Sequence, residues 1–181
     1  MQPETVLSKK RKEIVNQWFD AAMAAYPEGS GSFFKNNSDP FANPVGNTIS
    51  RCLHELFDEL MKSEMDTEAV RHALDGIIRI QSLQEFQPSD AIGFIFEIRP
   101  SIKACFRKTR GDTAVEAYLT ALSANTETLL RMAFDLYMEC RQKVFLLRAN
   151  HSNDRVRQLL IKKGYIQEIP KKGKNLEDID V

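Results

Sequence analysis

The sequence predicts an all-α protein: a single helical domain of about five to seven helices with a long C-terminal helix. Two observations lead to this prediction. Between Gly111 and Gly164 there is no glycine and no proline, the residues that most often interrupt a helix. In the rest of the chain, apolar residues recur at steps of three and four, as on one helix face. With 181 residues the chain suits one domain, which we expect over residues 1–163, followed by a mobile tail over residues 164–181.

The first helix is expected over residues 4–26, where Leu7, Ile14 and Trp18 share one face and Pro27 ends the pattern. Residues 27–45 are expected to be irregular, because they hold two glycines and three prolines. Three exposed phenylalanines would make a costly apolar patch. We therefore expect the phenylalanines of this segment to pack against the core: Phe33, Phe34 and Phe41.

The middle helices are placed by their caps. A helix over residues 44–62 begins with Pro44 at its first position and Asn43 as its cap. The next helix begins at Thr67 and ends before Pro88. The pair Ser89-Asp90 then predicts a cap for a fourth helix, which Pro100 should kink or split.

The last third of the chain predicts one long helix, or a few helices that meet without a break. New helices could begin at residues 123–126 and 150–154, which are rich in Ser, Asn and Asp. One apolar stripe repeats at close to 3.5 residues, and we take it as a candidate interface: Leu129, Ala133, Leu136, Cys140 and Leu147. A second stripe adjoins it, so the helix can pack on its own domain and still offer a face to another chain. If the first stripe is an interface between chains, Leu136→Asp should dissociate the oligomer while leaving the helical content largely intact.

Composition excludes several classes of protein. Lys plus Arg equals Asp plus Glu, 25 against 25, so no net field attracts nucleic acid. The sequence shows no signal peptide and no membrane-spanning apolar run, which predicts a cytoplasmic protein. The three cysteines, Cys52, Cys105 and Cys140, are far apart and are expected to be reduced and buried.

The sequence contains no recognisable catalytic motif. It has no G-x-G-x-x-G or G-K-[ST] loop and no nucleophile motif. Its adjacent carboxylates point apart on a helix, and His54 and His72 are not placed like haem ligands. We therefore expect no enzyme activity, no cofactor and no metal.

Several polar residues stand among apolar neighbours. They lie where the third predicted helix ends and on the long helix: Arg79, Gln81, Gln84, Glu85, Gln87, Asp135 and Arg141. They could form a buried hydrogen-bonded network that links the two elements and senses a ligand. Alternatively, these side chains form hydrogen bonds that serve only the structure, or they are simply exposed to solvent.

Four segments, in this order, carry a resemblance to a known family. They read NPVG from Asn43, IRIQSLQEFQPSDA from Ile78, FIF from Phe94, and AFDLYMECR from Ala133. Over roughly residues 5–160 the chain is similar to the N-terminal domain of RsbRD-type stressosome co-antagonist proteins. The motif residues of unknown role are Asn43, Pro44, Gly46, Arg79, Gln84, Phe86, Pro88, Ser89, Phe134, Asp135, Tyr137 and Arg141.

The resemblance implies a globin-like sensory or regulatory domain that binds no haem, dimerises, and passes a stress signal along its last helix. Members of the family pass it to a STAS or histidine kinase output domain. Only a short tail follows Lys163 here, so we expect a protein partner to carry the output in trans. The alternative function is a small-molecule or redox sensor. It would use an apolar pocket among Phe86, Phe94, Phe96 and Phe134, or the thiols of Cys105 and Cys140.

Overall fold

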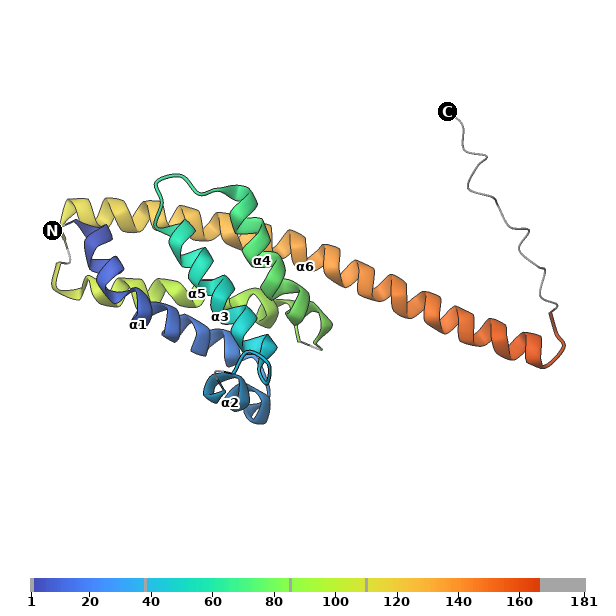
Figure 1. Cartoon of the computed structure of the whole chain (residues 1–181). Coiled ribbons are helices and arrows are strands. Elements are labelled where there is room, and N and C mark those ends of the chain that lie inside the picture. The colour runs from blue at the N-terminus through green and yellow to red at the C-terminus, as the bar shows by residue number, and fades with distance from the viewer. Residues whose placement is uncertain (1, 38, 85, 110, 167–181) are drawn as a thin grey trace, which may run out of the picture. The chain divides into compact units, whose positions relative to one another are not determined.

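The computed structural model describes residues 2–37, 39–84, 86–109 and 111–166. In these residues it contains six α-helices, one short 3-10 helix and no strand (Figure 1). The elements are α1 (Pro3–Met23), α2 (Glu28–Asn36), α3 (Pro44–Leu60), α4 (Thr67–Leu83), α5 (Pro88–Cys105), η1 (Arg107–Thr109) and α6 (Thr113–Lys162). The prediction of an all-α protein with a long C-terminal helix is confirmed.

The chain divides into two compact units, Met1–Gln142 and Lys143–Val181. The first unit contains α1 to α5 and residues 113–142 of α6, and the second contains residues 143–162 of α6. Helix α6 ends at Lys162 and is followed by Gly164, whose φ of 76° favours glycine. The N–H of Gly164 donates to the carbonyl of Ile161, and that of Tyr165 donates to the carbonyl of Leu160, both at 2.9 Å. Most of the predicted tail, residues 167–181, lies outside the described residues.

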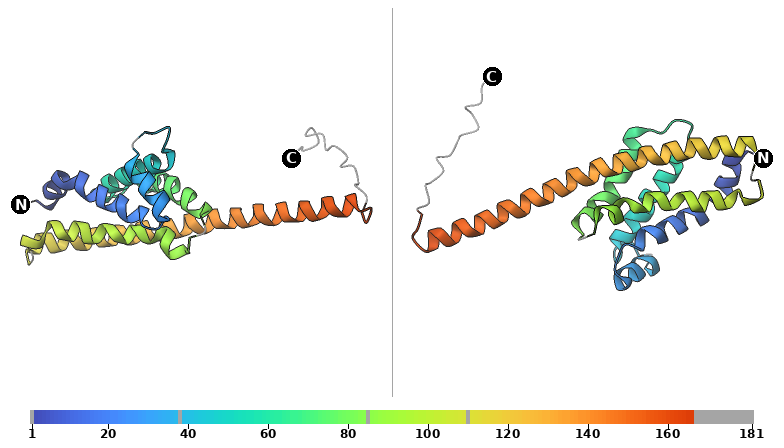
Figure 2. Two further views of the ribbon diagram at one scale, coloured as in Figure 1. Left: turned by 90° about the horizontal axis from the view of Figure 1, so that it is seen from below. Right: turned by 180° about the vertical axis from the view of Figure 1, so that it is seen from behind.

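The core of the first unit lies between α1, α3, α4, α5 and the first part of α6. Helices α1 and α5 run side by side (Figures 1 and 2), and the indole N–H of Trp18 donates to the carbonyl of Phe94 at 2.7 Å. Each helix contributes fully buried apolar side chains at helical spacing. They include Leu7, Ile14, Leu53, Leu56, Leu74, Ile77, Ile95, Ile98, Leu129 and Ala133.

Polar contacts also attach residues 113–142 of α6 to the other helices of this unit. The bonds run from the guanidinium of Arg99 to the carbonyl of Ser123 at 3.1 Å, from the Tyr118 hydroxyl to the sulfur of Met61 at 3.4 Å, and from Arg141 to the carbonyl of Ser82 at 3.1 Å. The first part of α6 is therefore tied to α5, to the end of α3 and to α4.

The prediction that residues 27–45 are irregular was wrong, because α2 occupies much of this segment. A Cβ added to Gly31 would lie 3.1 Å from the carbonyl oxygen of Met23. Glycine therefore allows α2 to approach the end of α1 closely, rather than breaking the helix. Phe34 packs edge-on against Tyr26, with ring centroids 5.3 Å apart. Phe41, however, is 96% exposed and Phe33 is 48% exposed. Of the three phenylalanines, only Phe34 therefore packs against the core as expected.

One of the later helices begins elsewhere than predicted, and two alternatives that the sequence left open are decided. Helix α5 begins at Pro88 rather than at a Ser89-Asp90 cap, and Pro100 does not split it. Neither polar cluster of the last third starts a new helix, since α6 is continuous. In the first cluster, the Thr126 hydroxyl donates to the carbonyl of Leu122 at 2.7 Å, so this buried polar group is satisfied inside the helix.

Candidate functional site

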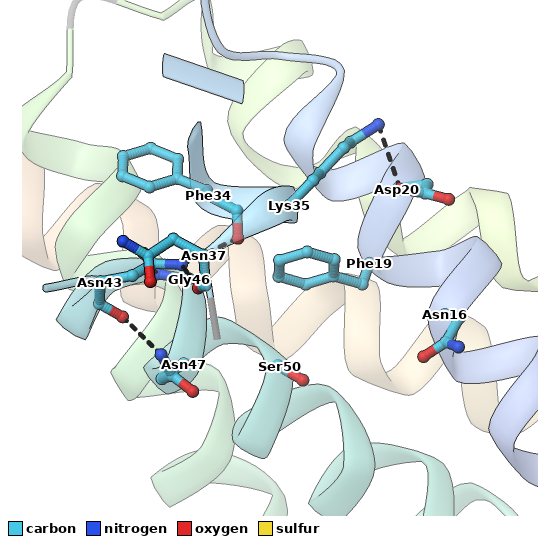
Figure 3. A pocket seen from close by; sticks show the side chains of 10 residues that line it. All are labelled: Asn16, Phe19, Asp20, Phe34, Lys35, Asn37, Asn43, Gly46, Asn47 and Ser50. Carbon is cyan, nitrogen blue, oxygen red and sulfur yellow. Dashed lines mark hydrogen bonds and ion pairs between the residues drawn. The ribbon is translucent and has the colours of Figure 1, made fainter. Parts of the chain in front are cut away.

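A pocket of the first unit lies between α1, α2 and α3 and has a volume of about 350 Å³ (Figure 3). Its walls are mainly polar. They are formed by Asn16, Phe19, Asp20, Phe34, Lys35, Asn37, Asn43, Gly46, Asn47 and Ser50. Two of the motif residues singled out from the sequence, Asn43 and Gly46, are therefore brought together at one site.

Asn43 organises this pocket. It caps α3 as the sequence predicts: its Oδ1 accepts from the N–H of Gly46 at 2.9 Å. Its Nδ2 donates to the carbonyls of Phe34 at 2.8 Å and Asn37 at 2.6 Å. The side chain, 1% exposed, thus has its oxygen and both amide hydrogens engaged. It joins the end of α2 to the start of α3.

Gly46 and Pro44 are explained by the same cap. A Cβ at position 46 would lie 2.5 Å from Nδ2 of Asn43, closer than atoms can pack, so the capping amide needs glycine there. Pro44 stands at the first helical position, where a missing N–H costs nothing. The Asn-Pro-x-Gly sequence is therefore a structural corner that shapes the pocket wall.

The remaining walls combine charge, amides and aromatic rings. Lys35 pairs with Asp20 at 3.1 Å, and Nδ2 of Asn47 donates to the carbonyl of Asn43 at 2.7 Å. The rings of Phe19 and Phe34 stand beside these groups (Figure 3). This lining suits recognition by hydrogen bonds. In the described part of the chain, no three His, Cys, Asp or Glu residues are grouped to hold a metal ion.

Asn43→Ala is expected to lower the free energy of unfolding by about 2–3 kcal/mol, because it removes the cap and leaves two carbonyls without their donor. Urea denaturation followed by circular dichroism measures this. Asn47→Ala, which removes a single bond to a carbonyl, is the matched control and should cost about 1 kcal/mol or less. Equal losses in the two variants would contradict the central role of Asn43.

A second group of motif residues lies where α4 passes into α5. Gln84 follows the end of α4, and Phe86 packs edge-on against Tyr26 with ring centroids 5.0 Å apart. These residues line an open pocket of about 540 Å³ together with Ala25 and Pro27. Burial raises the pKa of Tyr26 to about 12. Pro88 begins α5, and Ser89 beside it is exposed.

Only part of the predicted polar network forms. Arg141 links α6 to α4 through the carbonyl of Ser82. Arg79 and Asp135, in contrast, are exposed, and Arg79 pairs with Asp75 on its own helix. Gln81 is fully buried, but its amide has no hydrogen-bond partner among the described residues, and the same holds for the hydroxyl of Tyr137. Glu85 lies outside the described residues, and Gln87 is exposed at the start of α5.

The candidate interface stripe divides into buried and exposed parts. Leu129, Ala133 and Leu136 belong to the core of the first unit, Cys140 is half-buried, and Leu147 is exposed. The first three positions therefore pack within this chain and form no free face. Large exposed apolar residues of α6 in this unit lie on another side of the helix: Phe134 and Met138, 48% and 50% exposed. Phe134 belongs to the second apolar stripe of the sequence, but periodicity could not tell which stripe faces the core, because both repeat at helical spacing.

The residues proposed for an apolar or redox sensor are dispersed. Phe94 is buried against Trp18, whereas Phe96 and Phe134 are exposed. The guanidinium of Arg99 lies 5.8 Å from the Phe96 ring centroid. Burial raises the pKa of the thiols of Cys52 and Cys105, which lowers their thiolate fraction and so their reactivity.

The fold and its sites define an all-α domain built on a long C-terminal helix. Residues 12–151 match the family model described as the RsbT co-antagonist protein rsbRD N-terminal domain. The match covers most of the chain, so the chain belongs to this family of stress-signalling regulatory domains. No curated protein and no solved structure matches it. None of the helices in the described ranges is long and apolar enough to cross a membrane.

Proposed function

We propose that this chain is a cytoplasmic sensory and regulatory domain that acts by protein contact, as a homodimer, and performs no chemistry of its own. In this proposal the output is carried by a protein partner. The proposal is supported by α6 in the first unit, which has both a buried and an exposed apolar side. One side of the helix, with Leu129 and Leu136, lies in the core, and another side exposes Phe134 and Met138.

This arrangement gives the helix a means to transmit a signal. A change of packing at α4, at α5 or at the end of α3, which bond to α6 in this unit, would act directly on the buried side of α6. Packed helices shift as rigid elements by small translations and rotations, so such a change would displace the exposed side as well. Leu130, half-buried, lies one turn before Phe134, and Met138 lies one turn after it. These three residues form the proposed dimer face.

Phe134→Glu combined with Met138→Glu is expected to convert the dimer into a monomer, because two carboxylates per chain would have to be buried at its centre. Light scattering after gel filtration measures the mass, and circular dichroism should show unchanged helix content. Ala121→Glu with Ala124→Glu is the matched control, since it adds the same charge at exposed positions of α6. A native chain that is monomeric, or a double variant that stays dimeric, would reject this face.

The pocket at Asn43 favours a second candidate function, a small-molecule sensor. Its lining is richer in amide and charged groups than the apolar pocket expected from the sequence, so a ligand there would be polar. Thermal unfolding in the presence of a panel of small polar metabolites tests this, because a ligand that binds only the folded state raises the Tm. The same increase in a variant with Asn16→Leu and Ser50→Leu would show binding elsewhere.

A further inference from the structure

The part of α6 in the second unit, residues 143–162, has an unusual charge for this chain. Whereas acidic and basic residues balance over all 181 residues, this segment and the residue after it hold a single acidic residue, Asp154. Every residue from Phe145 to Leu160 is exposed. The basic residues here are Lys143, Arg148, Arg155, Arg157, Lys162 and Lys163.

Many of the charges and apolar residues are ordered along the helix. At 3.6 residues per turn, one narrow face of this segment carries Phe145, Ala149, Ser152, Val156 and Leu159, whereas the exposed Leu146 and Leu147 lie off this face. Three basic residues spaced by seven, Arg148, Arg155 and Lys162, follow one edge of that face. Lys143 and Arg157 fall on the other side of the helix. We call the narrow face the seam and the three spaced residues the basic row.

The seam is shaped for another helix. Ala149 and Ser152 at its middle are small, which allows the backbone of a second helix to approach closely, while the larger Phe145 and Val156 stand on either side. A helix that lies on a membrane surface needs a broad continuous apolar face. Here the polar run from Asn150 to Asp154 interrupts the apolar residues.

The segment also needs a contact to be a stable helix. Asn, His, Ser and Asp have low helix propensity, and they occupy its middle from Asn150 to Asp154. A second copy of the segment is a poor match, because each copy would bring the same positive charges to the contact. Positive charges along a helix edge are complementary instead to carboxylates on the facing helix.

We propose that residues 143–162 bind an acidic amphipathic helix of a partner protein, with its apolar residues on the seam and its carboxylates against the basic row. The proposal names a class of partner for the proposed function, and it therefore rests on that function. It uses other residues than the dimer face at Phe134 and Met138. Either contact can therefore fail in experiment while the other stands.

The test uses the full chain and a fluorescent synthetic peptide of matching length, with leucine at its seam positions and glutamate at its flanking positions. Fluorescence anisotropy should show binding that weakens as salt is added. A peptide with lysine in place of each glutamate should bind at least about tenfold more weakly. Replacing Arg148 and Arg155 by glutamate should weaken binding of the acidic peptide by at least about tenfold.

The matched control is Lys143→Glu with Arg157→Glu, which changes the net charge equally but on the other side of the helix. Equal weakening by the two double variants would mean unspecific attraction and would overturn the proposal. Binding to phosphatidylserine vesicles but not to the acidic peptide would assign the segment to a membrane instead. Loss of the dimer in the Arg148 and Arg155 variant would show that a second copy occupies the seam.

Discussion

Leu136→Asp is expected to abolish the folded state of the first unit rather than to separate a dimer. Leu136 is 2% exposed and belongs to the hydrophobic core. Removing a buried leucine costs about 2–5 kcal/mol from the lost contacts and the cavity. A buried carboxylate without a partner adds a further penalty of several kcal/mol. The sum is comparable to the whole stability of a domain, about 5–15 kcal/mol.

Circular dichroism and urea denaturation of the variant measure this loss. Phe134→Asp, two residues earlier on the same helix, is the control: it introduces the same charge at a half-exposed position. It should retain the native helix content and lower the free energy of unfolding by only about 1 kcal/mol. A folded, monomeric Leu136→Asp protein would instead show that Leu136 lies at the dimer interface.

This pair of substitutions shows how far periodicity predicts the structure. Apolar spacing, together with the caps, predicted the helix that begins at Pro44, the one that begins at Thr67 and the helical last third, because burial imposes that spacing on any helix with a covered side. It could not tell which covered side of α6 faces its own domain. Leu136 and Phe134 belong to equally regular stripes, and only the positions of the other helices distinguish them.

The pocket residues illustrate a different limit. Asn43 and Pro44 were identified as a cap and a first helical residue, because capping depends on neighbouring residues in the sequence. The further bonds of Asn43 to the carbonyls of Phe34 and Asn37 depend on α2. The sequence did not predict α2, because that segment contains glycines. Lys35 and Asp20 pair across two helices, and nothing in the sequence links them.

Trp18→Ala is expected to lower the free energy of unfolding by about 3–5 kcal/mol, the range for removing a large buried aromatic side chain. The side chain is fully buried, lies against the ring of Phe94, and donates its N–H to the carbonyl of Phe94 at 2.7 Å. It is therefore a main contact between α1 and α5. Since Trp18 is the chain's one tryptophan, its fluorescence cannot follow the variant, and circular dichroism during urea denaturation is the measurement.

Trp18→Phe separates the two contributions of this side chain. Phenylalanine keeps most of the apolar volume but lacks the N–H, so the variant should lose about 1–2 kcal/mol. A loss as large as that of Trp18→Ala would show that the hydrogen bond to Phe94, rather than packing, holds α1 against α5. A loss below about 1 kcal/mol for Trp18→Ala would contradict the burial of Trp18 itself.

If packing dominates, the contact between α1 and α5 can adjust by sliding, as a helix shift requires. A dominant hydrogen bond would instead fix the two helices in one register, and the signal would have to reach α6 through α4.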